Sequence, residues 1–183
     1  MIHYFAAKIR NFAEILLPLP DNTVEEMKIV LVSVGAVRDP DLGPLLARYT
    51  SRLPHYMPFE HVTVADVKTS RATTAEMQKE REGDAILSRV APGDCLVLFD
   101  ERGREMTSRE LAAFIDRKAA TLARNLVFVI GGPYGFSRAV YDRADSLLAL
   151  SRLTLTHEWA VALAAEQLYR AQTILRGEPY HHD

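Results

Sequence analysis

The sequence LVFVIGGPYGFSR, residues 126–138, combines an unbroken apolar run with a loop that has few side chains. Five apolar residues lead into Gly131 and Gly132, and Pro133 and Gly135 follow. An apolar run without polar interruption predicts a strand that is covered on both faces. Glycines at its end are favoured where main chain approaches a ligand closely, or where a tight turn needs a positive φ. The stretch therefore predicts a buried strand that ends in a bare loop at the edge of a sheet.

Similar strands alternate with helices along the rest of the chain. The other predicted strands are residues 28–35, 59–67, 95–100 and 147–153. The predicted helices are residues 42–53, one helix opened by the capping-box spacing TTAE at 73–76, another opened by TSRE at 107–110, and residues 157–176. Ser137 is placed to cap a short helix after the glycine loop. This alternation predicts an α/β fold with a mainly parallel sheet of five to six strands flanked by helices.

Three loops are the expected place for a ligand. In sheets of this kind, ligands bind beyond the carboxyl ends of the strands. The loops at those ends are DERGR at 100–104, GGPYG at 131–135 and SRLTLTHE at 151–158. In the first of them, Arg102 and Arg104 can contact RNA or simply be solvated.

Several chemistries lack their motifs in this sequence. The glycine loop matches neither G-x-G-x-x-G nor the Gly-Lys-Ser/Thr motif, and Pro133 removes one amide donor from any phosphate nest. This disfavours a pyrophosphate ligand and hydride transfer on a dinucleotide. The six histidines show no H-x-x-x-H spacing and Cys95 is the single cysteine, so we expect no metal site. The absence of a G-x-S-x-G elbow disfavours a serine hydrolase.

The composition is typical of one domain without a membrane span. With 183 residues and 48% hydrophobic content, the chain can form one core. No apolar run approaches the roughly 18 residues that cross a bilayer. A single cysteine excludes an internal disulfide and fits a reducing compartment, so we expect a cytoplasmic protein.

The charge of the chain limits how it can bind nucleic acid. Residues 1–26 hold two of the 22 basic and four of the 24 acidic residues, which leaves 20 of each sign in residues 27–183. A body without net charge cannot hold nucleic acid by bulk electrostatics. An RNA substrate would then require a local basic patch, the pairing of two subunits, or the shape of a larger assembly.

The first 26 residues differ from the rest. Phe5, Ile9, Phe12 and Leu16 follow the spacing of one helical stripe, which the sequence PLPDN ends. We expect either a dispensable extension or a protein whose true first residue is Met27. The predicted organisation is an extension, residues 1–26, and one domain, residues 27–183.

Three segments together resemble one enzyme family. They are FVIGGPYGFS at 128–137, LTLTHEWAVALAAEQLYRA at 153–171 and RGEPYHH at 176–182. Their order and spacing are similar to those of the RlmH-type 23S rRNA pseudouridine N3-methyltransferases of the SPOUT superfamily, from about residue 27 to the end. The resemblance implies a C-terminal trefoil knot, S-adenosylmethionine as the methyl donor, and a homodimer. It also implies methylation of a pseudouridine in 23S rRNA on assembled ribosomes.

The resemblance also implies the site residues. It places the cofactor against Phe99, Gly132, Ser151, Arg152, Leu153, Thr154, Leu155 and Thr156. The catalytic candidates are His157, Arg170 and Tyr180. His157 is expected to act as a base or substrate contact, or only to orient the start of the last helix. Arg170 can bind a phosphate, act across the dimer or hold structure, and Tyr180 belongs to a tail that closes over an active site, its own or the partner's.

Two positions depart from the family's pattern. Members commonly carry proline where this chain has Thr156, and arginine where it has Val161. The second departure removes a potential phosphate contact, so the substrate is less constrained than the cofactor. Two alternatives stay open: methylation of another RNA such as tRNA, and a non-catalytic dimer that binds ribosomes.

Overall fold

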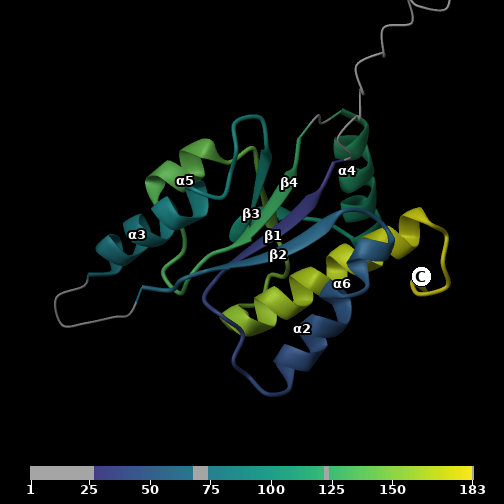
Figure 1. Cartoon of the computed structure of the whole chain (residues 1–183), viewed down its shortest axis with the longest axis horizontal. Helices are drawn as coiled ribbons and strands as arrows, with labels where there is room; N and C mark the ends of the chain where they lie inside the picture. Colours follow the sequence, from purple (N-terminus) through teal and green to yellow (C-terminus); the bar gives the residue numbers. More distant parts are fainter. Residues whose placement is uncertain (1–26, 68–73, 122–123, 183) are drawn as a thin grey trace, which may run out of the picture.

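The structure is a computed structural model that describes residues 27–67, 74–121 and 124–182. Five strands form one parallel sheet in the order β2-β1-β4-β3-β5 (Figure 1), which confirms the predicted α/β class. The strands are β1 Ile29–Val34, β2 Phe59–Val64, β3 Cys95–Glu105, β4 Leu126–Ile130 and β5 Ser146–Ala149. The helices are α2 Leu42–Thr50, the short 3₁₀ helix η1 Leu53–His55, α3 Ala75–Leu87, α4 Ser108–Thr121, α5 Arg138–Arg143 and α6 His157–Leu175.

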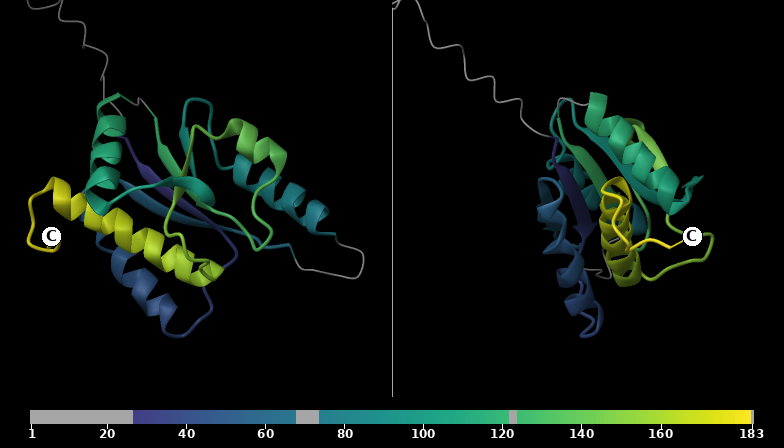
Figure 2. Two further views of the ribbon diagram at one scale, coloured as in Figure 1. Left: turned by 180° about the vertical axis from the view of Figure 1, so that it is seen from behind. Right: turned by 90° about the vertical axis from the view of Figure 1, so that its right-hand side faces the viewer.

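Helices cover both faces of the sheet, which explains the unbroken apolar strands. Helices α2, α4 and α6 pack on one face, and α3 and α5 pack on the other (Figure 2). Along β4, Phe128 belongs to the core of the first face, whereas Val127 and Val129 belong to the core of the second. Because successive side chains point to opposite faces and both faces are covered, every position of β4 is apolar.

Only one of the three predicted helix caps is present as expected. The hydroxyl of Thr107 accepts from Glu110 N at 3.2 Å, and Glu110 Oε2 accepts from Thr107 N at 2.8 Å, a complete capping box for α4. At α3 the cap is Thr74, whose hydroxyl accepts from Met77 N at 3.2 Å, while residue 73 lies outside the described residues. Ser137 occupies the predicted N-cap position of α5, but its buried hydroxyl makes no hydrogen bond, so the capping bond itself is absent.

Three strand ends at the carboxyl edge of the sheet differ from prediction by more than one residue, and β2 is one of them because it ends at Val64 and not at residue 67. Strand β3 pairs with β5 as far as Phe99, leaves the ladder, and rejoins β5 at Arg104 instead of ending at residue 100. A Cβ on Gly103 would lie 2.5 Å from backbone atoms of Leu148 in β5, an approach that only glycine permits. Strand β5 ends at residue 149, and the hydroxyl of Ser151 then accepts from the backbone N of residue 153 at 2.9 Å, a local turn that competes with strand pairing.

The described residues contain no candidate for a membrane-spanning helix or for a metal site. Within residues 27–67, 74–121 and 124–182, no helix has the length and apolar character needed to cross a membrane. The same ranges contain no group of three His, Cys, Asp or Glu side chains that could hold a metal ion. The predicted extension, residues 1–26, lies outside the described residues, and the implied knot stays a prediction.

Candidate functional site

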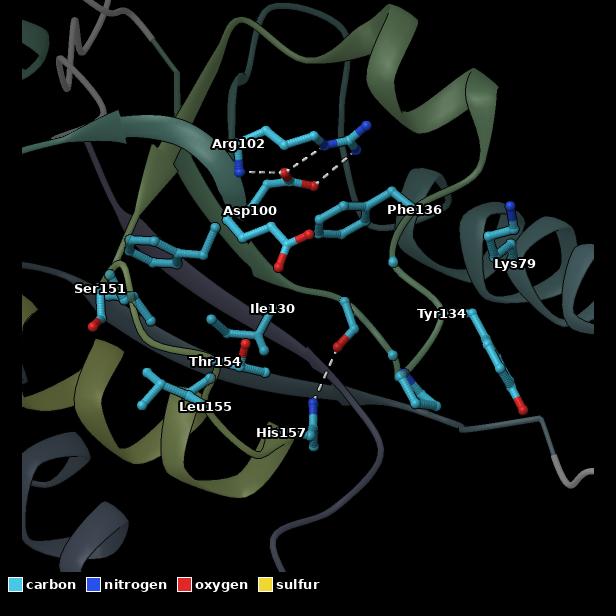
Figure 3. Close-up of a pocket in the computed structure, with 18 of the residues that line it drawn as sticks. Lys79, Asp100, Arg102, Ile130, Tyr134, Phe136, Ser151, Thr154, Leu155 and His157 are labelled. Atoms are coloured by element: carbon cyan, nitrogen blue, oxygen red, sulfur yellow. Dashed lines mark hydrogen bonds and ion pairs between the residues drawn. The ribbon is translucent and has the colours of Figure 1, made fainter.

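A cavity of about 640 Å³ lies beyond the carboxyl ends of β3 and β4 (Figure 3). The end of β3, the glycine loop after β4 and the loop before α6 bound it, which are the three loops that the sequence indicates. Helix α3 contributes Lys79 at one side. Seven of the predicted site residues line the cavity: Phe99, Gly132, Ser151, Leu153, Thr154, Leu155 and His157. The other four, Arg152, Thr156, Arg170 and Tyr180, do not line it.

The glycine loop has no room for side chains at its first two positions. Gly135 makes the turn with a φ of 78°, and its N–H donates to the Gly132 carbonyl at 3.1 Å. A Cβ on Gly131 would lie 2.9 Å from the Phe136 ring, and a Cβ on Gly132 would lie 2.3 Å from Oε2 of Glu82 in α3. The sequence argument attributes the bare loop to ligand approach or to a tight turn. The structure adds a different cause, because groups packed behind the loop exclude side chains there.

One wall of the cavity is apolar and flat. The ring of Phe99 stacks on Phe128, with 5.5 Å between ring centroids and 17° between ring planes. Ile130 and Leu155 line the same cavity, from β4 and from the loop before α6 (Figure 3). Such a wall is suited to the face of an aromatic ring.

The first turn of α6 is tied to two loops. The Nδ1 atom of His157 lies 3.0 Å from the Gly131 carbonyl oxygen (Figure 3). Because a carbonyl only accepts, Nδ1 carries the proton, and Nε2 is left enclosed without a partner. The carboxylate of Glu158 accepts from the backbone N–H groups of Arg38 and Asp39, at 3.1 and 2.7 Å. In this arrangement His157 holds the glycine loop through Nδ1, while Nε2 is buried and has no hydrogen-bond partner.

Sequence reasoning missed a polar network at the cavity. Asp100 Oδ1 accepts from Arg102 N at 2.9 Å and from Arg102 Nε at 3.0 Å, while Oδ2 accepts from the Tyr141 hydroxyl at 2.5 Å. Burial acts to raise the pKa of Asp100, but the hydrogen bonds from Arg102 and Tyr141 outweigh it and hold that pKa below its usual value. Burial and the bond to Asp100 raise the pKa of Tyr141. An acid directly after the run CLVLF was the one signal for this network.

Arg170 and Tyr180 lie near the far end of α6, about 20 Å along the helix from His157 at 1.5 Å per residue. Arg170 donates through Nε to Glu166 Oε1 at 2.9 Å, and its guanidinium lies 4.7 Å from the centre of the Tyr180 ring. The Tyr180 hydroxyl donates to Glu166 Oε1 at 3.2 Å and lies 3.3 Å from the Tyr49 hydroxyl in α2. Within one chain, these two residues hold the C-terminal tail on α6 and α2.

The remaining predicted site residues, Arg152 and Thr156, do not line the cavity, and neither does Val161. The side chain of Arg152 is 86% exposed, with its Nε 4.0 Å from Glu105. Thr156 is the N-cap residue of α6 but makes no side-chain hydrogen bond. Val161 is fully buried in the core beneath α6. The position that commonly holds arginine in the resembling family is therefore a packing position here.

Known proteins similar to this chain cover nearly all of its described part. A family model described as "Predicted SPOUT methyltransferase" matches residues 27–181. Proteins named "Ribosomal RNA large subunit methyltransferase H" from Parabacteroides distasonis and Porphyromonas gingivalis are 43% and 46% identical over 157 residues, 86% of this chain and 100% of each relative. The protein of that name from Cytophaga hutchinsonii is 46% identical over 156 residues, 85% of this chain and 100% of its own.

A solved structure titled as a probable methyltransferase from Bordetella pertussis gives a TM-score of 0.49 at 17% identity, over 81% of this chain and 95% of that one. This similarity is too low to support an argument. The family model and the relatives that match over their full length are sufficient, however. The chain belongs to the SPOUT methyltransferase family.

Proposed function

We propose that the protein transfers a methyl group from S-adenosylmethionine to N3 of a pseudouridine in the 23S rRNA of the large ribosomal subunit, on assembled ribosomes. The observation that carries the proposal is the similarity to proteins named as large-subunit rRNA methyltransferases, which extends over their whole length at 43 to 46% identity. The cavity supports it, because it lies where the three loops predicted from the sequence meet.

The residues around the cavity fit this methyl donor. A volume of about 640 Å³ lies within the range of small-molecule sites, roughly 300–1,000 Å³. The apolar wall at Phe99 suits an adenine ring, and the donor carries no phosphate. Of the described residues that line the cavity, Lys79 is paired with Glu76 at 2.6 Å and Arg102 with Asp100 at 3.0 Å. These pairs leave no cluster of cations for a phosphate, which agrees with a phosphate-free ligand.

The residues that line the cavity serve methyl transfer in three ways: they exclude water, contact the nucleotide and hold the reacting atoms in line. The donor, when bound, supplies a methyl group on a positively charged sulfur. Phe99, Ile130 and Leu155 exclude water, and a dry site favours a reaction that neutralises charge. Arg102, fixed by Asp100, is placed to contact the incoming nucleotide. Holding the reacting atoms in line can supply roughly 7–11 kcal/mol in favourable cases.

His157 acts in this scheme as a positioning residue. Its Nδ1–H donates to the Gly131 carbonyl, and this bond fixes the glycine loop against the start of α6. The N3 proton of the base must leave during the reaction, and Nε2 of His157 is enclosed. We therefore place the removal of that proton on another group or on solvent.

A second copy of the chain completes the site in our proposal. Arg170 and Tyr180 do not line the cavity of their own chain, so a catalytic role for them requires the cavity of a partner. Leu153, beside the cavity, is 77% exposed and Trp159 in the first turn of α6 is 55% exposed. Exposed apolar side chains at a site's edge are suited to a subunit contact. Sedimentation analysis tests this: a monomer at micromolar concentration contradicts the shared site.

The test of the proposed function is methyl transfer from radiolabelled donor to intact ribosomes, free 23S rRNA and tRNA, followed by mapping of the modified base. We expect label on ribosomes, at N3 of one pseudouridine. Label on tRNA would support the alternative RNA substrate. Donor binding without transfer to any RNA would support the non-catalytic ribosome-binding dimer, and absence of donor binding would refute all enzymatic readings.

We also propose that residues 1–26 are dispensable. The family model begins at residue 27, and the relatives match 156 or 157 residues of this chain over their whole length. Deleting residues 1–26 is expected to leave methyl transfer unchanged. A loss of transfer in a folded deletion variant contradicts this.

A further inference from the structure

Glu82 is a buried carboxylate that pairs with no cation among the described residues. It lies in the middle of α3, is 2% exposed, and belongs to the buried polar residues of the structure. Its Oε1 accepts from Gln78 Nε2 at 2.8 Å and from Val67 N at 3.3 Å. Its Oε2 is enclosed and has no hydrogen-bond partner. No ion pair joins it to a cation within the part of the chain that the structure describes.

The unpartnered oxygen lies directly behind the glycine loop. A Cβ built on Gly132 would be 2.3 Å from Oε2, so the carboxylate touches the main chain of that residue. Gly132 itself lines the cavity. Glu82 does not itself line the cavity, so the carboxylate lies against the side of Gly132 and reaches the ligand space only through that residue's main chain.

Asp100 is a buried carboxylate that lines the cavity and, unlike Glu82, pairs with a cation. Asp100, whose side chain is 7% exposed, is paired with the guanidinium of Arg102 and accepts from Tyr141. Its charge is compensated within the chain. Burial of a carboxylate without a cation costs free energy, and the cost is offset when a positive charge arrives nearby.

We propose that Glu82 makes the cavity selective for positive charge, so that it binds the sulfonium donor in preference to the neutral thioether that remains after transfer. The inference rests on the proposed function. In methyl transfer the carbon–sulfur bond breaks, sulfur keeps the electron pair, and the methyl group bonds to N3, whose proton passes to solvent or a base. The ligand in the cavity thus loses one positive charge at the moment of reaction.

The preference of the cavity for the charged donor favours replacement of the neutral product by a new donor molecule. Before transfer, Glu82 attracts the ligand, and after transfer this attraction to the sulfur is gone. Unit charges several ångströms apart in a partly screened interior interact strongly enough to change affinity by about tenfold. Gln78 and Val67 hold the carboxylate in place, so the effect needs no movement of the loop.

Calorimetric binding of three ligands tests the inference with Glu82→Gln, which keeps the shape and removes the charge. The ligands are S-adenosylmethionine, S-adenosylhomocysteine and sinefungin, an analogue with an amine in place of the S-methyl group. We expect the dissociation constants of the two cationic ligands to rise about tenfold, which is about 1.4 kcal/mol, and that of S-adenosylhomocysteine to change by less than about twofold. Glu80→Gln, the same substitution on an exposed position of α3, is the matched control and should change none of them.

Equal weakening of all three ligands would mean that Glu82 only shapes the loop, and unchanged constants would mean that its charge is not felt; either overturns the inference. If Glu82→Gln does not fold, Gln78→Lys puts an ammonium group beside the carboxylate and is expected to remove the same preference. A wild-type protein that binds none of the three ligands refutes the proposed function itself. Binding of all three without the charge-dependent change refutes only the role of Glu82.

Discussion

One side chain at each end of α6 shows how differently buried polar groups are satisfied: Glu166 near the far end and His157 in the first turn, where the neighbouring Glu158 is hydrogen-bonded. At the far end, Glu166 receives hydrogen bonds from Arg170 and Tyr180, and Tyr180 also meets Tyr49. At the first turn, His157 Nε2 is buried without a partner. Five buried side-chain atoms lack a partner among the described residues. Four of them belong to Gln78 and Glu82 in α3, to Ser137 before α5, and to His157 at the start of α6.

This difference separates side chains that stabilise the fold through hydrogen bonds from buried side chains with a polar atom that has no hydrogen-bond partner. Buried polar atoms are nearly always hydrogen-bonded in native proteins, so a concentration of exceptions requires an explanation. Only Gln172 Nε2 is an exception toward the far end of α6. Two of the five atoms lie at or beside the cavity, because His157 lines it and Glu82 touches Gly132, which also lines it.

The largest expected effect comes from Gly132→Val. The new side chain would meet the Glu82 carboxylate, so we expect donor affinity to fall at least a hundredfold and unfolding free energy to fall by about 1–3 kcal/mol. Calorimetry and urea denaturation measure the two. Gly43→Val in α2, where a Cβ meets nothing within 4 Å, is the control for binding. Lost binding with unchanged stability would instead place the new side chain in the cavity.

Mixed dimers test whether the far end of α6 serves a partner's cavity. Gly132→Val and Arg170→Ala chains are each expected to be inactive alone. In a statistical mixture, half of the dimers would contain one intact site, so about a quarter of wild-type activity should return. No recovery, with heterodimers demonstrated by mass spectrometry, would confine Arg170 to its own chain.

A pair of substitutions at His157 separates positioning from proton transfer. Asparagine can donate to the Gly131 carbonyl as Nδ1 does, so His157→Asn is expected to keep kcat within about threefold, whereas His157→Phe should lose about a hundredfold. Rate against pH gives the second measurement. Equal loss in both variants, with disappearance of one limb of the pH profile, would make His157 a base.

Glu166→Gln tests the satisfied end of the helix. It removes the charge that Arg170 and Tyr180 share, and the two side chains of the ion pair are only 25% and 14% exposed. We expect a loss of about 1–2 kcal/mol of unfolding free energy and no change in donor affinity. Weaker donor binding by the Glu166→Gln protein would contradict the inference that Glu166 stabilises the fold without affecting the cavity.

The smallest effect is expected at Asp100 in acid. Its folded-state pKa lies below the usual 3.8, because hydrogen bonds from Arg102 and Tyr141 outweigh burial. A lowered pKa contributes stability that is present above the unfolded value and is lost as pH falls through the folded value. Asp100→Asn should therefore flatten the stability profile below about pH 4. An identical acid profile in both proteins would contradict the network.

Prediction from sequence succeeded where one local signal was sufficient. The run at β4 is apolar because both faces of the sheet are covered, and the spacing from Thr107 to Glu110 forms its capping box with neighbours in the chain. The three loops at the carboxyl edge follow from the parallel order of the strands. These inferences need no knowledge of distant contacts.

It failed where the decisive contact comes from elsewhere in the fold. Gly132 is bare because Glu82 of another helix lies behind it, and Gly103 because β5 passes against it. No pattern in the sequence joins those pairs. The resemblance names Arg170 and His157 as catalytic candidates without saying whose cavity each serves, and α6 holds them about 20 Å apart within a chain. Whether Arg170 serves a partner's cavity stays a prediction.

The central position of β4 has a consequence for synthesis of the protein. Strand β4 lies between β1 and β3, although β1 leaves the ribosome about 100 residues earlier. At translation rates of roughly 5–20 residues per second, the edge of β1 that pairs with β4 stays unpaired for about 5 to 20 s. During that interval the nascent chain has an unpaired strand edge. Chaperones that bind the nascent chain should therefore raise the yield of native protein more than they would for a sheet in which each strand pairs with the next one in sequence.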